Sequence, residues 1–322
     1  MNSVFSRILK ALCVVTAVAS LSACGGASST VNPFVPTRVI GLGDAYNDVG
    51  SDNSGHAPFT VRGTGEVSTV VEQVAALFGV GSSGTFVGAV TYTNLPASGV
   101  FSYAVGGALI NSGADSLADQ IVSLSADVGG AFTSSDLIVI AAGTQDIKAA
   151  YSTSGAETAA GLLEAQVKIL LGKGAKHILI LQPLELSVTP YARASGITVG
   201  TADVTTSPTV KFNTKISSEL YDYVSRQGLS YNPVIYGSAF SSTFNTYAQT
   251  TPYLEFSTST QVPYCTSTPP STDPASMSGC SKRVGDSTVY DTTLFADNLN
   301  LTPAGNRWVA QYLYNATAQG WR

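Results

Sequence analysis

Short, mainly apolar runs alternate along the chain with longer segments in which apolar residues recur every three or four positions. The apolar runs cover 38–43, 102–105, 136–142, 175–183 and 234–236. Runs of this length without a regular polar alternation are typical of strands that are buried on both faces of a parallel sheet. We therefore predict a parallel sheet at the centre of the fold.

The segments between these runs show helical periodicity, with their apolar residues on one face of a helix. The predicted helices cover 66–78, 116–128, 157–171, 208–226 and 302–318. Strands that alternate with helices predict an α/β fold, here a three-layer α/β/α sandwich with a mainly parallel sheet. Ligands of such sheets bind at the carboxyl ends of the strands, so the residues just after each strand are the candidates for function.

The first residues have the pattern of a secretory signal peptide. Arg7 and Lys10 precede an apolar run that covers 11–19. This run is too short to cross a bilayer as a helix, whereas a basic start followed by a short apolar run is typical of an export signal. We predict that residues 1–23 are the signal peptide.

The end of this segment, Leu21-Ser22-Ala23-Cys24, resembles a bacterial lipobox, in which the cysteine becomes the lipidated first residue. An acyl chain on Cys24 would anchor the protein to a membrane without spanning it. Gly25 follows, which by resemblance to Gram-negative lipoproteins favours the outer membrane. Residues 24–37 are rich in Gly, Ser, Thr and Pro and are predicted to be a flexible tether, and 38–322 to be a single domain.

Composition narrows the class of protein further. Charged residues make up 11% and hydrophobic residues 44% of the 322 residues, which excludes a disordered chain and a long coiled coil. The formal net charge is −5, from 16 basic and 21 acidic residues. A protein that follows a nucleic-acid backbone needs a basic face, so we expect no nucleic-acid partner.

Cysteine and histidine are scarce. Cys13 would leave with the signal peptide and Cys24 would carry the lipid, so Cys265 and Cys280 remain in the mature domain. An exported compartment is oxidising, and we expect a disulfide between these two residues. Two cysteines and two distant histidines do not make a cluster of metal ligands, so neither a metal nor another cofactor is expected.

Four short motifs follow the predicted strands or precede the last helix. They read Gly43-Asp44-Ala45-Tyr46-Asn47-Asp48, Ala104-Val105-Gly106-Gly107-Ala108, Gly143-Thr144-Gln145-Asp146 and Phe295-Ala296-Asp297-Asn298-Leu299-Asn300. In order and spacing they resemble the four blocks of the SGNH, or GDSL, hydrolase family, over nearly all of 38–322. The resemblance implies the flavodoxin-like SGNH hydrolase fold, and for the family it implies ester hydrolysis.

Three of the four signature residues of that family are replaced. By the resemblance, the nucleophilic serine falls on Ala45, the oxyanion-hole asparagine on Gln145 and the general-base histidine on Asn300. The oxyanion glycine is retained as Gly106, or as Gly107 in an alignment shifted by one residue. The acid that orients the base is retained as Asp297.

These replacements remove the chemistry of the family. The Ala45 methyl group has no lone pair to attack a carbonyl, and the Asn300 amide takes up no proton near neutral pH. Gln145 still offers an N–H group, but one methylene further out than asparagine would. Oxyanion donors act only at about 2.7–3.1 Å from the developing charge, so this donor is altered as well.

Other residues near the motifs are candidates for a non-standard catalytic set. They are His56, Thr144, Asp44, Asp48 and Asp146. His56 lies in a Gly/Ser-rich loop after the first motif, and any two of the three acids would make a paired-carboxylate site. His177, at the start of a predicted strand, is expected to be a half-buried strand residue.

The sequence therefore predicts an exported lipoprotein of the bacterial cell envelope that keeps a hydrolase fold without hydrolysis. We expect this pseudoenzyme to bind a small ester, acyl or glycan ligand at the former catalytic centre, and to meet the membrane through its N-terminal lipid. An active ester hydrolase with a non-standard catalytic set is one alternative, and a structural or partner-docking envelope lipoprotein is another. Turnover of a short acyl ester and retention of a ligand distinguish the three.

Overall fold

The computed structural model describes residues 33–50, 60–61, 68–81, 86–88, 95–197, 206–228, 232–237, 263–265 and 292–321. The folded unit begins at Phe34, close to the predicted start of the domain. The expected signal peptide, the expected lipidation residue Cys24 and most of the expected tether lie outside the described residues, and so do His56 and Cys280.

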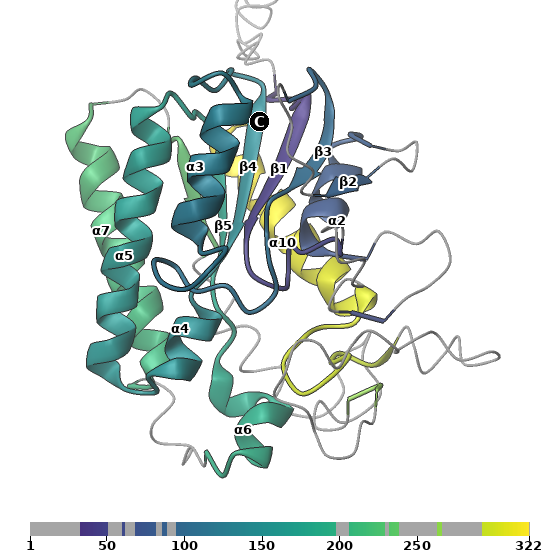
Figure 1. Cartoon of the computed structure of the whole chain (residues 1–322), viewed down its shortest axis with the longest axis vertical. Helices are drawn as coiled ribbons and strands as arrows, with labels where there is room; N and C mark the ends of the chain where they lie inside the picture. The colour runs from purple at the N-terminus through teal and green to yellow at the C-terminus, as the bar shows by residue number, and fades with distance from the viewer. Residues whose placement is uncertain are drawn as a thin grey trace, which may run out of the picture. The chain divides into compact units, whose positions relative to one another are not determined.

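Six parallel strands form one sheet, in the order β2-β3-β1-β4-β5-β6. The strands are β1 (Arg38–Gly43), β2 (Phe86–Gly88), β3 (Gly99–Ser102), β4 (Asp136–Ala141), β5 (Ile178–Leu181) and β6 (Val234–Tyr236). The first strand of the chain thus lies inside the sheet, between β3 and β4 (Figure 1). The turn that follows β1 therefore starts from the middle of the carboxyl edge.

Alternate residues of the inner strands face opposite sides of the sheet. On β1, Ile40 and Leu42 pack into the hydrophobic core on one side, whereas Val39 packs into a second core on the other side. On β4, Ile138 and Leu137 are divided between the two cores in the same way. Because both faces are covered, the strands need apolar residues at every position, which explains the unbroken apolar runs.

Helices cover both faces of the sheet, as predicted. They are α2 (Val70–Leu77), α3 (Leu117–Asp127), α4 (Thr144–Ala149), α5 (Thr153–Gly172), α6 (Pro190–Ala194), α7 (Pro208–Arg226) and α10 (Pro303–Gly320), with a 3₁₀ turn at Leu186–Val188. Helices α3, α5 and α7 lie on one face, and α2 and α10 lie on the other (Figure 1). The three-layer α/β/α sandwich with a parallel sheet is confirmed.

Three predicted boundaries were wrong, and one of them is the start of α5, which lies at Thr153 rather than at 157 because the Ser152 side chain caps the helix there. The strand expected at 102–105 lies three residues earlier, because Val100 and Phe101 are its buried pair and Gly99 aligns with Arg38 of β1. Helix α2 begins at Val70 rather than at 66, because Glu72 accepts the Thr69 N–H (2.7 Å) and closes a capping box there. The short elements β2, α4 and α6 were not predicted.

The amino edge of the sheet is closed by aromatic rings. The Phe34 ring stacks on the His177 ring with centroids 3.6 Å apart, and lies edge-on to Trp321 at 5.6 Å. The Phe34 N–H donates to the Trp321 carbonyl oxygen (2.9 Å), and the Thr37 N–H donates to the Ser135 carbonyl oxygen (2.9 Å). Residues 34–37 therefore belong to the domain rather than to the tether, which extends less far than expected.

Candidate functional site

The turn after β1 is held between β4 and the segment that precedes α10. The Asp44 N–H donates to the Ala141 carbonyl oxygen of β4 (2.7 Å). The Tyr46 hydroxyl donates to the Leu299 carbonyl oxygen (3.1 Å), although these two residues are 253 positions apart in the chain. The first and the last sequence motifs are therefore in direct contact at the carboxyl edge of the sheet.

Gly43 allows this turn to form. Its φ is +106°, and a Cβ at this position would lie 1.8 Å from the Ala141 carbonyl oxygen. A side chain at this position would have to displace β4, so the close approach of the two strands requires glycine. The structure thus explains why the first motif begins with glycine.

Ala45, at the position of the family's nucleophile, is a packed residue. Its side chain is 6% exposed and belongs to an apolar cluster with Val61, Tyr264 and Ala296. The Tyr264 N–H donates to the Phe295 carbonyl oxygen (2.9 Å), which holds Tyr264 beside the last motif. The methyl group of Ala45 therefore contributes to packing at the place where the family has a hydroxyl.

Gly106, expected to supply an oxyanion N–H, already has an anionic partner. Its N–H donates to Oδ2 of Asp48 (2.6 Å), and Oδ1 of the same carboxylate accepts the Gly50 N–H (2.8 Å). Asp48 is 2% exposed and bridges the first and second motifs. A carboxyl group of the chain itself therefore occupies the donor that the family uses for the oxyanion.

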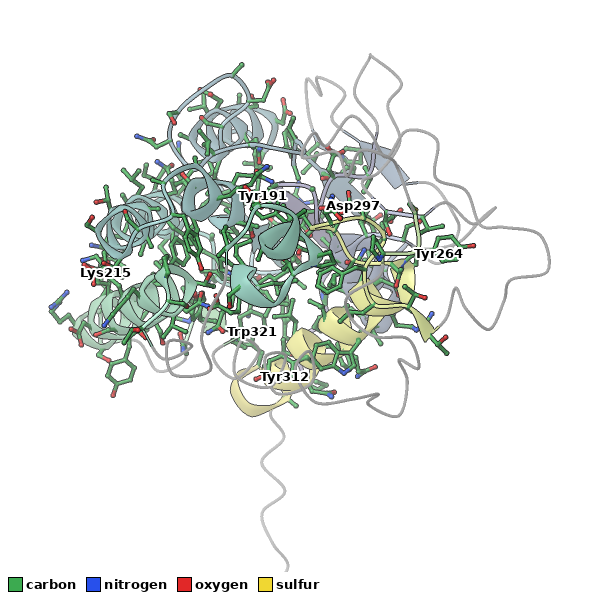
Figure 2. The ribbon with its side chains drawn as sticks, turned by 90° about the horizontal axis from the view of Figure 1, so that it is seen from below. Tyr191, Lys215, Tyr264, Asp297, Tyr312 and Trp321 are labelled. Atoms are coloured by element: carbon green, nitrogen blue, oxygen red, sulfur yellow. The ribbon has the colours of Figure 1, made fainter. Side chains whose placement is uncertain are left out.

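Asn300, at the position of the base, keeps the hydrogen bond that a histidine would make to the acid. Its Nδ2 donates to Oδ2 of Asp297 (2.8 Å), while Oδ1 of Asp297 accepts the N–H groups of Asn300 (2.6 Å) and Leu299 (2.7 Å). Figure 2 looks onto the carboxyl edge of the sheet and labels Asp297 together with Tyr264. The acid therefore orients an amide instead of an imidazole.

Gln145, at the position of the oxyanion asparagine, stands in the first turn of α4. The helix starts directly after Gly143, whose φ is +105° and where a Cβ would lie 2.5 Å from Cζ of Phe212. Oε1 of Gln145 accepts a long hydrogen bond from Nζ of Lys148 (3.4 Å), and this Nζ lies 5.3 Å from the centre of the Tyr191 ring. The Gln145 side chain is thus turned toward Lys148.

Three carboxyl groups at this edge are hard to ionise. Burial raises the pKa of Asp44 from 3.8 to about 7, with smaller contributions from Asp146 and Asp48, whereas the Tyr46 N–H lowers it. Burial also raises the pKa of Asp146, although the Ile110 N–H opposes this shift. The same cause raises the pKa of Asp297, which its own hydrogen bonds and Lys148 partly offset. An additional negative charge at this edge would be unfavourable.

Two of the residues considered for a non-standard catalytic set, Asp48 and Thr144, are buried. Asp48 accepts two backbone N–H groups, and Thr144 is 2% exposed in the first turn of α4. His177 lies at the opposite edge of the sheet against Phe34, and burial lowers its pKa to about 4. His56 lies outside the described residues.

Sequence reasoning missed three residues of this site. Val61 and Tyr264 pack on Ala45, and Lys148 lies beside Gln145. Val61 and Tyr264 lie outside the four motifs, and the residues around them show no pattern that predicts the contact with Ala45. Lys148 carried a usable signal, since it follows Gln145 by three residues in what is a helical turn.

The described residues contain no group of three His, Cys, Asp or Glu side chains that could hold a metal ion. Within the same ranges, no helix has both the length and the apolar composition that are needed to cross a membrane. Cys265 is described and touches the apolar cluster around Ala45, but Cys280 is not described. The disulfide between them therefore stays a prediction.

A family model described as GDSL-like Lipase/Acylhydrolase matches residues 39–313. Among solved structures, the chain is similar to a member of the lipolytic protein G-D-S-L family from Veillonella parvula DSM 2008, at 12% sequence identity and a TM-score of 0.41. That similarity covers 85% of this chain and 94% of the other. A comparison with curated proteins found no match.

Proposed function

Because the chain belongs to the GDSL-like lipase/acylhydrolase family, we propose that it is an exported pseudoenzyme, anchored by lipid, that binds a ligand without hydrolysing it. The observation that carries the loss of hydrolysis is the hydrogen bond from the Gly106 N–H to Asp48 (2.6 Å). An oxyanion hole offers N–H groups to a negative oxygen that forms during the reaction. Here a carboxyl oxygen of the chain itself occupies this donor.

The other positions support the same proposal. Ala45 has no lone pair for nucleophilic attack, and the Asn300 amide accepts no proton near neutral pH. The hydrogen bond between Asn300 and Asp297 (2.8 Å) gives both residues a structural role, because it stabilises the conformation of the segment before α10. Each element of the former catalytic centre thus contributes to packing or to hydrogen bonding.

The surroundings also limit the ligand. Asp44, Asp48, Asp146 and Asp297 stand at the carboxyl edge of the sheet, three of them with a raised pKa. The burial that raises these pKa values disfavours any added negative charge, so a neutral ester, acyl or glycan group suits this edge better than a carboxylate or phosphate. We propose a neutral ligand.

The esterase assay tests this proposal directly. We expect the purified mature protein to hydrolyse p-nitrophenyl acetate and butyrate no faster than the Asp297→Ala variant or the heat-denatured protein. Spectrophotometric release of p-nitrophenol measures the rate. Clear turnover that follows the protein through purification would contradict the proposal and would support an active hydrolase with a non-standard catalytic set.

The proposed location has a separate test. After expression in a bacterial host that processes lipoproteins, we expect the mature chain to begin at an acylated Cys24, and Cys265 and Cys280 to resist alkylation until they are reduced. Mass spectrometry of the intact protein and of its peptides measures both. Cys24→Ser is the matched control, since it should abolish acylation and leave the Cys265–Cys280 pair unchanged. An unmodified N-terminus at another residue would contradict the lipid anchor. Alkylation of both thiols without reduction would contradict the disulfide.

A further inference from the structure

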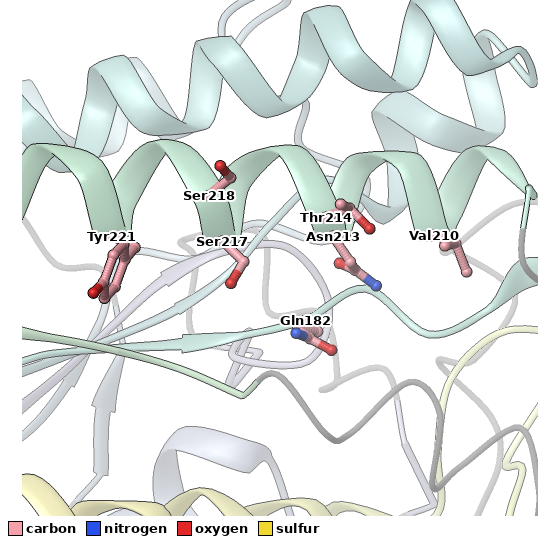
Figure 3. Close-up of a pocket in the computed structure, with 7 residues that line it drawn as sticks. All are labelled: Gln182, Val210, Asn213, Thr214, Ser217, Ser218 and Tyr221. Carbon is pink, nitrogen blue, oxygen red and sulfur yellow. The ribbon is translucent and has the colours of Figure 1, made fainter.

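We propose that the groove between α7 and the carboxyl end of β5 binds a neutral saccharide. Its volume is about 470 Å³, within the range of about 300–1,000 Å³ that small-molecule sites occupy. Figure 3 shows the lining residues, which are Gln182, Val210, Asn213, Thr214, Ser217, Ser218 and Tyr221. This inference goes beyond the proposed function, because the groove is a second site that shares no residue with the former catalytic centre.

The floor of the groove consists of amide side chains in fixed positions. Asn213 is 6% exposed, and its Oδ1 accepts the Tyr236 hydroxyl (2.7 Å). Its Nδ2 points to the Pro183 carbonyl oxygen (3.4 Å). Gln182, directly after β5, is 2% exposed. Both amides are therefore placed by the fold before a ligand arrives, which lowers the cost of ordering them on binding.

The wall is one face of α7. Val210, Thr214, Ser217 and Tyr221 follow one another at spacings of three and four, so they lie along the same side of the helix. Figure 3 shows Ser217 and Tyr221 on the side of α7 that faces Gln182. The hydroxyl groups of Thr214, Ser217 and Ser218 can both donate and accept hydrogen bonds. These groups match the hydroxyls of a sugar, which also do both.

Tyr221 supplies an apolar surface at the end of this wall. Its side chain is 73% exposed, which is unusual for a large aromatic residue of a folded domain. The carbon-bound hydrogens of one face of a sugar ring are apolar and can stack on an aromatic ring, while the hydroxyls at the rim of the sugar reach polar partners. The exposed ring beside a row of hydroxyls fits such a ligand.

The charge and polarity of the lining favour a neutral saccharide over an anionic ligand or an acyl chain. One ion pair of α7 lies away from the groove: Nζ of Lys215 contacts Oε1 of Glu219 (2.8 Å), and neither residue is part of the lining. Among the lining residues that the structure describes, none carries a charged side chain, so these residues offer an anionic ligand no charge-assisted hydrogen bond. An acyl chain would need a mainly apolar lining, whereas Val210 and the Tyr221 ring are the apolar groups among these described residues.

The test is binding of neutral oligosaccharides to the mature protein in a detergent without a sugar headgroup. The probes are maltohexaose, cellohexaose, mannohexaose and the hexamer of N-acetylglucosamine, with hexagalacturonate as the anionic comparison. Isothermal titration calorimetry measures the affinity. We expect at least one neutral hexamer to bind with a sub-millimolar Kd, and hexagalacturonate not to bind.

Variants locate the binding on α7. We expect Tyr221→Ala to weaken binding at least about tenfold and Tyr221→Trp to retain it, since indole keeps the stacking surface. Tyr223→Ala is the matched control on the same helix, because the Tyr223 ring is engaged by Lys168 of α5 (5.0 Å), and it should change the Kd less than twofold. Circular dichroism melts check that each variant is folded.

Two results would overturn this inference. One is the absence of binding by every neutral hexamer at millimolar concentration, and the other is binding that Tyr221→Ala leaves unchanged. Failure of the proposed function would look different, since it would appear as turnover of acyl esters with or without saccharide binding.

Discussion

The double variant Ala45→Ser/Asn300→His is expected to hydrolyse p-nitrophenyl acetate slowly, whereas either single variant stays inactive. The new serine alone has no base to take its proton, and the new histidine alone has no nucleophile to activate. Together they restore the pair, and Asp297 is in place to orient the imidazole, since it already binds the Asn300 side chain at 2.8 Å. Initial rates of p-nitrophenol release, compared with the unmodified protein, measure the gain.

The rate should rise much further when the oxyanion hole is reopened. Asp48→Ala frees the Gly106 N–H, and one regained oxyanion donor is worth roughly 10²–10³ in kcat. Gln145→Asn should add to this, because it moves the second donor back by one methylene. In the unmodified background the same two changes should give no activity, since residues of a catalytic set act as a unit.

Controls distinguish restored catalysis from a rate gain that comes only from weaker packing around the site. Asp297→Ala in the rebuilt variant should remove most of the gain, whereas Asp222→Ala on the exposed side of α7 should not. A rebuilt variant whose rate is the same with and without Asp48 would contradict the assigned role of the Gly106 hydrogen bond. If Tyr264→Ala is needed before any rate appears, the packing of Tyr264 on Ala45 is the block.

The free energy of unfolding is expected to depend on pH by several kcal/mol through Asp44, and the Asp44→Asn variant is expected to lose this dependence. Burial raises the pKa of Asp44 from 3.8 to about 7 in the folded protein, so between these values the folded state holds a proton that the unfolded state has released. The contribution of Asp44 to stability is therefore full below pH 4 and is lost as the pH rises to about 7. From the size of the shift, this loss is roughly 4 kcal/mol.

Urea unfolding at pH 4, 5, 6, 7 and 8 measures this effect as the difference between the variant and the unmodified protein. The variant should gain relative stability with rising pH and level off above about pH 8. Any constant cost of the asparagine amide cancels in this comparison. Asp222→Asn, at an exposed position of α7, is the control. A difference that does not change with pH would show that Asp44 stays ionised in the folded state.

The sheet and the long helices could be predicted because their signal is local. Helix α7 and strand β6 lie where the periodicity of apolar residues placed them, at Pro208–Arg226 and Val234–Tyr236. The start of β3 could not be placed correctly: the strand begins at Gly99, and its backbone hydrogen bonds to β1 continue as far as Val105, whose N–H donates to the Gly43 carbonyl oxygen (3.1 Å). Pairing between strands is a non-local property, and a run of apolar residues does not record it.

The site could be predicted only in part for a similar reason. The motifs gave the positions of Ala45, Asp297 and Asn300, and the structure brings the first and last motifs together as the resemblance implied. The partners of these residues did not follow from the motifs. The Asp48–Gly106 hydrogen bond joins residues 58 positions apart, and Tyr264 reaches Ala45 from a segment with no motif of its own.

The ring of Phe34, which contacts His177 and Trp321, fixes the point at which the chain enters the domain. The chain enters the domain at the amino edge of the sheet, so a lipid at the proposed residue Cys24 would hold the domain by this edge. The residues between Cys24 and Phe34 give this connection a reach of roughly 30 Å when fully extended. The carboxyl edge, with Gln182 and the former catalytic centre, lies at the other end of the strands from this entry point. A long polymer in the aqueous phase could reach it without approaching the bilayer.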